Sequence, residues 1–246
     1  MILEAVNFTA TWLSSPRRRA DEIRSSVALW ARARRCARQW ASHEASSRAF
    51  VTKMLEQLPQ RRVAAVLGSG LLRDVPVEAL SANFREVRLY DLQHLASVRA
   101  RARLKGLSNL HFENRDLAGP GALDFLKAIA ELDLVISANL MSQIGVASAR
   151  VSPGTGVRQL LEAHVEGLAA LGVPACLVTD IAYEVTDKAG TVIEAEDLMH
   201  GISLPAHEAE WFWEVAPFGE LDPDLRAVHR VVAIRLPPAV PAPSLP

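Results

Sequence analysis

The sequence has only two cysteines, Cys36 and Cys176, among its 246 residues. One pair of thiols supplies neither a disulfide scaffold nor the four ligands of a cysteine-built zinc site, so we expect a reduced, cytoplasmic protein. The chain also lacks an excess of one charge, because 27 Lys and Arg residues stand against 28 Asp and Glu residues, for a net charge of -1. Bulk charge therefore provides no attraction to nucleic acid or to an anionic membrane.

Long apolar runs are missing as well. No stretch approaches the ~20 continuous apolar residues that span a bilayer, and the first residues lack the charged and then apolar pattern of a secretion signal. The absence of a Gly-x-Ser-x-Gly elbow and of a P-loop disfavours acyl transfer through a serine elbow and P-loop phosphate chemistry. His43, His207 and His229 form no local metal-ligand motif, so we expect no metal. Half of the residues are hydrophobic, which predicts a soluble globular protein.

Residues 1–59 predict a helical cap. Apolar residues recur at steps of three, four and seven from Ile23 to Trp40, which is the pattern of a helix with one buried stripe. A second stripe, from Phe50 to Leu58, is stopped by Pro59. Arginines crowd the opposite face of the first helix. We interpret this face as a solvated surface, although it would also suit RNA, an acidic carrier protein or a phosphorylated substrate.

Short apolar runs alternate with amphipathic segments from residue 60 to residue 236. This alternation predicts an α/β fold, a mostly parallel sheet with helices on both faces. The strand-like runs are 62–67, 87–90, 110–112, 132–136 and 174–179, and helical spacing appears in 94–105, 121–131 and 157–171. Residues 182–186 and 191–195 predict a hairpin in a flap at 181–210, and residues 211–215 and 227–236 predict two antiparallel strands that complete the sheet. The proline-rich residues 237–246 predict an extended tail.

Polar residues at the carboxyl ends of these strands are the candidate site, because open parallel sheets bind ligands there. Gly68 and Gly70 would let the backbone turn sharply and approach a ligand closely. Asp91 follows about 20 residues later, where a carboxylate can accept both hydroxyls of a ribose, although it also suits a helix cap. Asp116 could accept from an adenine amino group while the Leu117 amide donates to the ring.

These features, in this order, resemble class I S-adenosylmethionine-dependent methyltransferases. The resemblance covers residues 60–236 and rests on Val66-Leu67-Gly68-Ser69-Gly70, Leu89-Tyr90-Asp91, Asn114-Arg115-Asp116-Leu117 and residues 134–140. It implies a Rossmann-like, seven-stranded sheet that binds S-adenosylmethionine, moves its methyl group to a nucleophile and leaves S-adenosylhomocysteine as product. The cofactor-binding residues that it implies are Gly68, Ser69, Gly70, Arg73, Asp74, Asp91, Leu92, Asp116, Leu117 and Asn139.

Two positions depart from the family's pattern. An acid usually stands two residues before the first glycine, where this chain has Val66, and a third glycine often stands where it has Leu72. Arg73 and Asp74 are therefore candidates for binding the carboxylate and the ammonium of the cofactor, while Asp74 also suits a plain helix-entry role. Asn139 is followed by Leu140-Met141 rather than by Pro-Pro-Tyr, which disfavours methylation of DNA bases.

Three side chains are candidates for catalysis. His43 continues the inward-facing stripe of the cap, His207 follows the flap, and Tyr183 lies with Asp180 at the end of the fifth strand, where either could orient a hydroxyl or an amine. A role in packing or a position on the surface would explain each of these residues as well as a role in catalysis does.

The main hypothesis is methyl transfer to a small-molecule acceptor by in-line displacement, in which the fold aligns the two reacting groups. We expect neither a nucleic acid nor a membrane as partner. Three alternatives stay open: transfer of the aminocarboxypropyl arm of the same cofactor, a non-catalytic module that binds a nucleoside or a partner, and a nicotinamide-binding domain. The last normally has glycine or alanine where this chain has Arg73.

Overall fold

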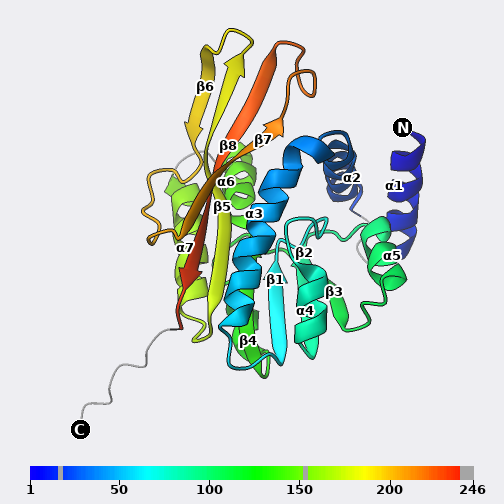
Figure 1. Cartoon of the computed structure of the whole chain (residues 1–246), viewed down its shortest axis with the longest axis vertical. Coiled ribbons are helices and arrows are strands. Elements are labelled where there is room, and N and C mark those ends of the chain that lie inside the picture. The colour runs from blue at the N-terminus through cyan, green and yellow to red at the C-terminus, as the bar shows by residue number, and fades with distance from the viewer. Residues whose placement is uncertain (16–18, 152–154, 239–246) are drawn as a thin grey trace.

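The computed structural model describes residues 1–15, 19–151 and 155–238, and within them one sheet of eight strands forms the centre of the molecule (Figure 1). The strands along the sheet follow the order β3-β2-β1-β4-β5-β8-β7, and β6 pairs with β5. The strands are β1 (Val63–Leu67), β2 (Glu86–Asp91), β3 (Leu110–Asn114), β4 (Leu132–Ala138), β5 (Ala175–Asp187), β6 (Val192–Asp197), β7 (Ala209–Ala216) and β8 (Leu225–Leu236). Strands β1 to β5 are mutually parallel, whereas β8 is antiparallel to both β5 and β7.

Helices cover both faces of this sheet. They are α1 (Ile2–Ser14), α2 (Ala20–Arg35), α3 (Ala37–Glu56), α4 (Val77–Asn83), α5 (Ala96–Leu104), α6 (Leu140–Val151) and α7 (Thr155–Ala169), with a 3-10 helix at Asp124–Ala128. In β1, Ala64 and Val66 pack into the core under α3, α4 and α5, while Ala65 and Leu67 pack into the core under the 3-10 helix and α7. A strand buried on both faces needs apolar side chains at every position, which explains its uninterrupted hydrophobic run.

The N-terminal region differs from the expected pair of stripes. A separate helix, α1, precedes them, and the predicted helix from Ile23 to Trp40 is broken at Cys36 into α2 and α3. Helix α3 lies against β7 and across the face of the sheet (Figure 1). Its residues Phe50 and Met54 share one core with the strand residue Val66.

Two other predictions are wrong in detail. The helix expected at 121–131 is reduced to the 3-10 helix Asp124–Ala128, because Gly121 and Glu131 take left-handed backbone angles (φ +69° and +57°) on either side of it. The predicted hairpin is present, since residues 182–186 pair antiparallel with β6, but its first strand is not separate: β5 continues past Asp180 to Asp187 and pairs with β8 along its whole length. Of the predicted tail, residues 239–246 lie outside the described residues.

Candidate functional site

The glycine loop after β1 turns tightly beneath the end of β4. Gly68 and Gly70 both take positive φ angles, +70° and +45°. A Cβ atom on Gly68 would lie 2.8 Å from the carbonyl oxygen of Ala138 and 2.8 Å from Cβ of Leu140. Only glycine therefore fits at this position, which brings the loop into contact with the residues that follow β4.

Asp91 joins the tips of β1 and β2. Its Oδ2 accepts a 2.7 Å hydrogen bond from the backbone N–H of Gly70, and its Oδ1 is 3.4 Å from the backbone nitrogen of Gln93. Burial raises the pKa of the Asp91 carboxyl, and these backbone N–H groups act in the opposite direction. A carboxylate has about four lone-pair positions, so Asp91 keeps acceptor capacity for a ligand's hydroxyl groups. The structure thus places Gly70 and Asp91 side by side, as the sequence predicts.

Ser69, between the two glycines, belongs to a buried hydrogen-bonded chain. Its hydroxyl lies 2.8 Å from Nε2 of His94, and Nδ1 of His94 lies 3.0 Å from Oδ1 of Asn114. Because that amide oxygen can only accept, the imidazole proton is on Nδ1 and Ser69 donates to Nε2. Burial lowers the pKa of His94 to about 4, which keeps the ring neutral. Asn114 in turn donates to Oε1 of Gln93, which also accepts from Ser15 at the end of α1.

A small hollow of about 70 Å³ opens between the glycine loop and α3. The loop side and the end of β4 contribute Gly68, Gly70, Leu71, Arg73, Asp74, Ala138 and Asn139, and the facing wall contributes Leu29, Trp40, His43, Glu44, Gln143 and Trp213. The imidazole of His43 stacks on Trp213, with ring centres 4.0 Å apart. The hollow therefore has a polar floor at the strand ends and an aromatic wall.

Asn139 connects this floor to the wall. Its backbone takes a left-handed angle of φ +49°, and its Nδ2 lies 2.5 Å from Oδ2 of Asp74 and 3.2 Å from Nε2 of His43. The indole N–H of Trp211 donates to Nδ1 of His43 over 3.0 Å. Burial lowers the pKa of His43 to about 4 and raises that of Asp74 to about 6. The Oδ1 atom of Asn139 is buried and has no hydrogen-bond partner.

Arg73 and Leu72 complete the loop. The Nε of Arg73 donates to Oε1 of Glu44 over 2.5 Å, and its carbonyl oxygen accepts from Arg48, so α3 holds this residue from two sides. Leu72, at the position where the methyltransferase family often has a third glycine, is buried and takes φ +55°. The chain therefore keeps a left-handed turn here without a glycine, and hydrophobic burial offsets the conformational cost.

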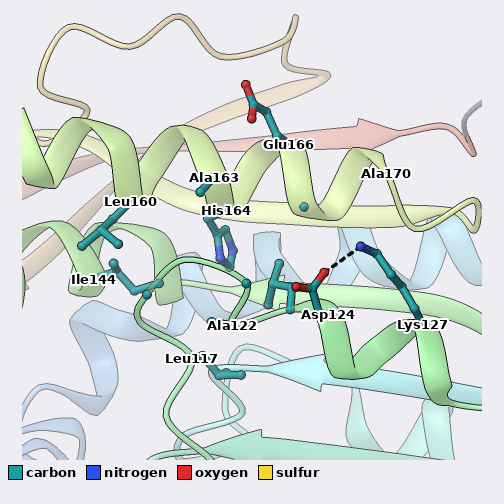
Figure 2. Close-up of a pocket in the computed structure, with 14 residues that line it drawn as sticks. Leu117, Ala122, Asp124, Lys127, Ile144, Leu160, Ala163, His164, Glu166 and Ala170 are labelled. Carbon is teal, nitrogen blue, oxygen red and sulfur yellow. Dashed lines mark hydrogen bonds and ion pairs between the residues drawn. The ribbon is translucent and has the colours of Figure 1, made fainter.

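A second hollow lies on the face of the sheet opposite α3, between the loop after β3, the 3-10 helix, α6 and α7 (Figure 2). Leu117 lines it together with Ile144 and His164. His164 is buried 2.9 Å from the hydroxyl of Ser137 at the end of β4, and burial lowers its pKa to about 4. Asp116 lies outside the hollow, exposed, with Oδ1 accepting from the Ala118 N–H.

Comparisons with known proteins identify solved structures only. No protein-family model and no curated protein matches the sequence. A DhpI–SAH complex is 17% identical, with a TM-score of 0.40, over 84% of this chain and 95% of that chain. The N-methyltransferase NodS from Bradyrhizobium japonicum WM9 is 11% identical (TM-score 0.39, 78% and 95% covered). An rRNA methylase from Streptococcus thermophilus is also 11% identical (TM-score 0.35, 75% and 93% covered).

The sheet has the expected five parallel strands, the antiparallel pair β7 and β8, and helices on both faces, but it has eight strands instead of seven because β6 also pairs with β5. The chain has a Rossmann-like α/β fold. Within this fold, the glycine loop, Asp91 and Asn139 meet at the carboxyl ends of β1, β2 and β4. Leu92 follows Asp91 and is 45% exposed, so its side chain is accessible to a ligand.

Of the three candidate catalytic residues, only His43 lines the hollow beside the glycine loop. The hydroxyl of Tyr183 donates to Glu194 and Glu196 on β6, and these carboxylates raise the pKa of the tyrosine. His207 lies 3.3 Å from a carboxylate oxygen of Glu210 and lines another hollow, beside Ile202 and Arg230. The described residues contain no group of three or more His, Cys, Asp or Glu that could hold a metal.

Sequence reasoning named Asp180 and His229 separately but did not predict that they meet near the aromatic wall. Nδ1 of His229 on β8 lies 3.1 Å from Oδ2 of Asp180, and the ring of His229 meets the edge of Trp213. The residues come together because β8 runs antiparallel to β5 and places His229 opposite Tyr183. No local pattern in the sequence reveals this register, although the polar Asp180 at the end of an apolar run was a usable signal.

Proposed function

We propose that this protein is an S-adenosylmethionine-dependent methyltransferase that acts on a small molecule. The observation that carries the proposal is the hydrogen bond from the Gly70 N–H to Asp91, which joins two strand tips directly beside a hollow. A carboxylate held in this way presents its remaining lone pairs to the two hydroxyl groups of a ribose.

The residues around this contact fit the rest of such a cofactor. The buried, unpartnered Oδ1 of Asn139 and the carboxylate of Asp74 are acceptors for an ammonium group, and they replace the acid that Val66 does not provide. Val66 is fully buried in the core, so it has no access to a ligand. The glycine loop admits a ligand close to its backbone because Gly70 carries no side chain.

At the other end of the ligand, we propose that Leu92 packs against the adenine and that Leu117, beside the hollow of Figure 2, offers its backbone N–H, with Asp116 accepting from the amino group. These residues would bind the cofactor by packing and hydrogen bonds. The reactive group would belong to the cofactor. The bound cofactor would supply an electrophilic methyl group.

The protein's own contribution to the reaction is to align the acceptor and to exclude water. Trp40 and Trp213 close the hollow beside α3, and the neutral ring of His43 faces Asn139 at its base. Alignment of this kind lowers the barrier by several kcal/mol without a covalent step on the enzyme. A wall formed by α3 favours a small acceptor over a nucleic acid strand, which would need an open groove.

Calorimetric titration with S-adenosylhomocysteine tests the proposal. We expect micromolar or tighter binding by the wild-type protein and a loss of ~10- to 100-fold in Asp91→Ala, because hydrogen bonds to a charged group contribute about 1.5–3 kcal/mol each. Asp21→Ala, which removes an exposed carboxylate on α2, is the matched control and should bind like the wild type. Absence of heat with both S-adenosylhomocysteine and S-adenosylmethionine would contradict the proposal.

If the cofactor binds, the mass of the modified acceptor identifies the group that is transferred. A gain of one methyl group supports methyl transfer, whereas a gain of the larger aminocarboxypropyl group would establish the alternative reaction of the same cofactor.

A further inference from the structure

Asp180 is a buried carboxylate with one unused oxygen. Its side chain is only 8% exposed. The Oδ2 atom accepts from the hydroxyl of Ser142 over 3.2 Å and lies 3.1 Å from Nδ1 of His229, whereas Oδ1 is buried without a hydrogen-bond partner. The Nδ1 atom of His229 also forms no aligned hydrogen bond despite its short distance from Oδ2. Two buried polar atoms of one cluster are therefore unsatisfied, which is costly in the free protein.

This cluster lies behind residues that line the hollow beside the glycine loop, and Asp180, Ser142 and His229 do not line it themselves. Asn139 is one of the residues that line the hollow. Its backbone N–H donates to the carbonyl oxygen of Val178, which lies two residues before Asp180. On the other side, Trp213 contacts both rings: it stacks on His43 and meets His229 with ring centres 5.8 Å apart. The charge of Asp180 also reaches His43, where it partly opposes the effect of burial on the pKa of that ring.

The surroundings of Asp180 are suited to a positively charged group. Asp133 provides the comparison, because its side chain is 9% exposed and Arg62 donates to both of its oxygens. Asp180 has no Lys or Arg partner among the described residues, and burial keeps the nearby His43 neutral. An ammonium ion would supply both the missing charge and N–H donors, and the face of a tryptophan attracts cations as well.

We propose that Asp180 is the anchor for the acceptor and that the acceptor is a small primary or secondary amine. The N–H groups of the ammonium ion bind Oδ1 of Asp180 beside His229, and its organic part packs against Trp213. For transfer, the ammonium ion would first give one proton to Asp180. The lone pair of the neutral nitrogen would then form the N–C bond as the bond between sulfur and the methyl carbon breaks, with S-adenosylhomocysteine as the leaving group. This inference rests on the proposed function, since it assigns the acceptor of the same site. Ser142 and His229 act as positioning residues that fix the carboxylate.

Matched pairs of amines and alcohols test the chemistry of the acceptor. Ethylamine and ethanol, benzylamine and benzyl alcohol, and tryptamine and tryptophol have nearly the same shape and differ in charge. Each is titrated into protein saturated with S-adenosylhomocysteine, with calorimetry as the readout. We expect at least one amine to bind ~10-fold more tightly than its alcohol, and Asp180→Asn to reduce this ratio below ~3-fold, as the loss of one charge-assisted contact predicts.

Three results would overturn the assignment while S-adenosylhomocysteine still binds: no amine binds at millimolar concentration, an alcohol equals its amine, or the preference persists in Asp180→Asn. Failure of the proposed function itself is recognised separately, because S-adenosylhomocysteine then fails to bind the wild-type protein. The Glu196→Gln variant, which removes an exposed carboxylate on β6, should keep the wild-type preference.

Thermal stability gives a readout that needs no ligand. Because Asp180 has no Lys or Arg partner among the described residues, we expect Asp180→Asn to keep or raise the melting temperature, by up to ~2–4 °C for a chain of this size. Asp133→Asn, which breaks the contacts with Arg62, should lower the melting temperature. A fall in Asp180→Asn as large as that in Asp133→Asn would assign Asp180 a structural role and overturn the proposal.

Discussion

Gly68 and Gly106 have almost the same left-handed backbone angle, φ +70° and +71°, in very different surroundings. A Cβ atom on Gly68 would meet Ala138 and Leu140 at 2.8 Å, whereas one on Gly106 would have no neighbour within 4 Å. We therefore expect Gly106→Ala to cost about 1 kcal/mol of unfolding free energy, from backbone strain alone. Gly68→Ala should cost more, because the end of β4 must also move, and it should weaken S-adenosylhomocysteine binding. Urea denaturation and calorimetry of both variants check this, and equal costs would contradict it.

Single residues differ in how far the sequence reveals their positions. Gly68 and Asp91 were predictable together because both end buried strands, and parallel strands end at one edge of the sheet. Tyr183 was placed near the same edge, but β5 continues beyond Asp180 and carries the tyrosine to the glutamates of β6. The meeting of His229 with Asp180 depends on the register of two antiparallel strands distant in sequence, which no local pattern encodes.

Helix α1 caps the start of α5 from outside. The backbone N–H of Ala96 donates to the hydroxyl of Thr11 over 2.9 Å, and that of Ser97 donates to Oδ1 of Asn7 over 3.3 Å. No side chain of α5 itself caps this end. Because an N-cap contributes about 1 kcal/mol, we expect Thr11→Val to lower the free energy of unfolding by roughly that amount. Thr9→Val, at an exposed position of the same helix, is the control, and equal effects in urea denaturation would contradict the capping role.

Helix boundaries were less predictable than strand cores. The break at Cys36 falls inside a continuous apolar stripe, and the stripe continues on both sides because Ala33, Cys36 and Trp40 pack together against Trp213. The apolar periodicity of a helix indicates that one of its faces is buried, but it does not indicate which element packs against that face. Helix α6 directly follows the fourth strand, and no helix is predicted there from the sequence.

The whole α/β arrangement follows from patterns that every strand repeats. Each of the five parallel strands is a short apolar run ended by a polar residue or a glycine, so the parallel order and the helices on both faces were predictable. The position of α3 across β7 was not, because it depends on which of several apolar faces pack together once the chain has folded. The closed wall of the candidate site results from that packing, and so the sequence indicates the cofactor side of the site better than the acceptor side.

Three buried histidines on different elements give the molecule a shared response to acid. His43 on α3, His94 before α5 and His164 on α7 each have a pKa lowered to about 4 from 6.5 by burial. Between these values the unfolded chain binds protons that the folded chain does not, so stability falls as the pH falls from 6.5 towards 4. Each shift corresponds to about 3 kcal/mol. Asp74, whose pKa is raised to about 6 from 3.8, has the opposite effect on the pH dependence of stability, but it is one group against three.

We therefore expect the free energy of unfolding, measured in urea, to decrease steeply between pH 6.5 and pH 4.5. His94→Gln keeps a polar side chain beside Ser69 but cannot titrate, so its stability should depend on pH by about one bound proton less than that of the wild type. His111→Gln, at an exposed position on β3, should leave the wild-type slope unchanged. If stability is constant across this range, or if both variants reduce the slope equally, the buried neutral histidines do not control acid stability and the unfolding must have another cause.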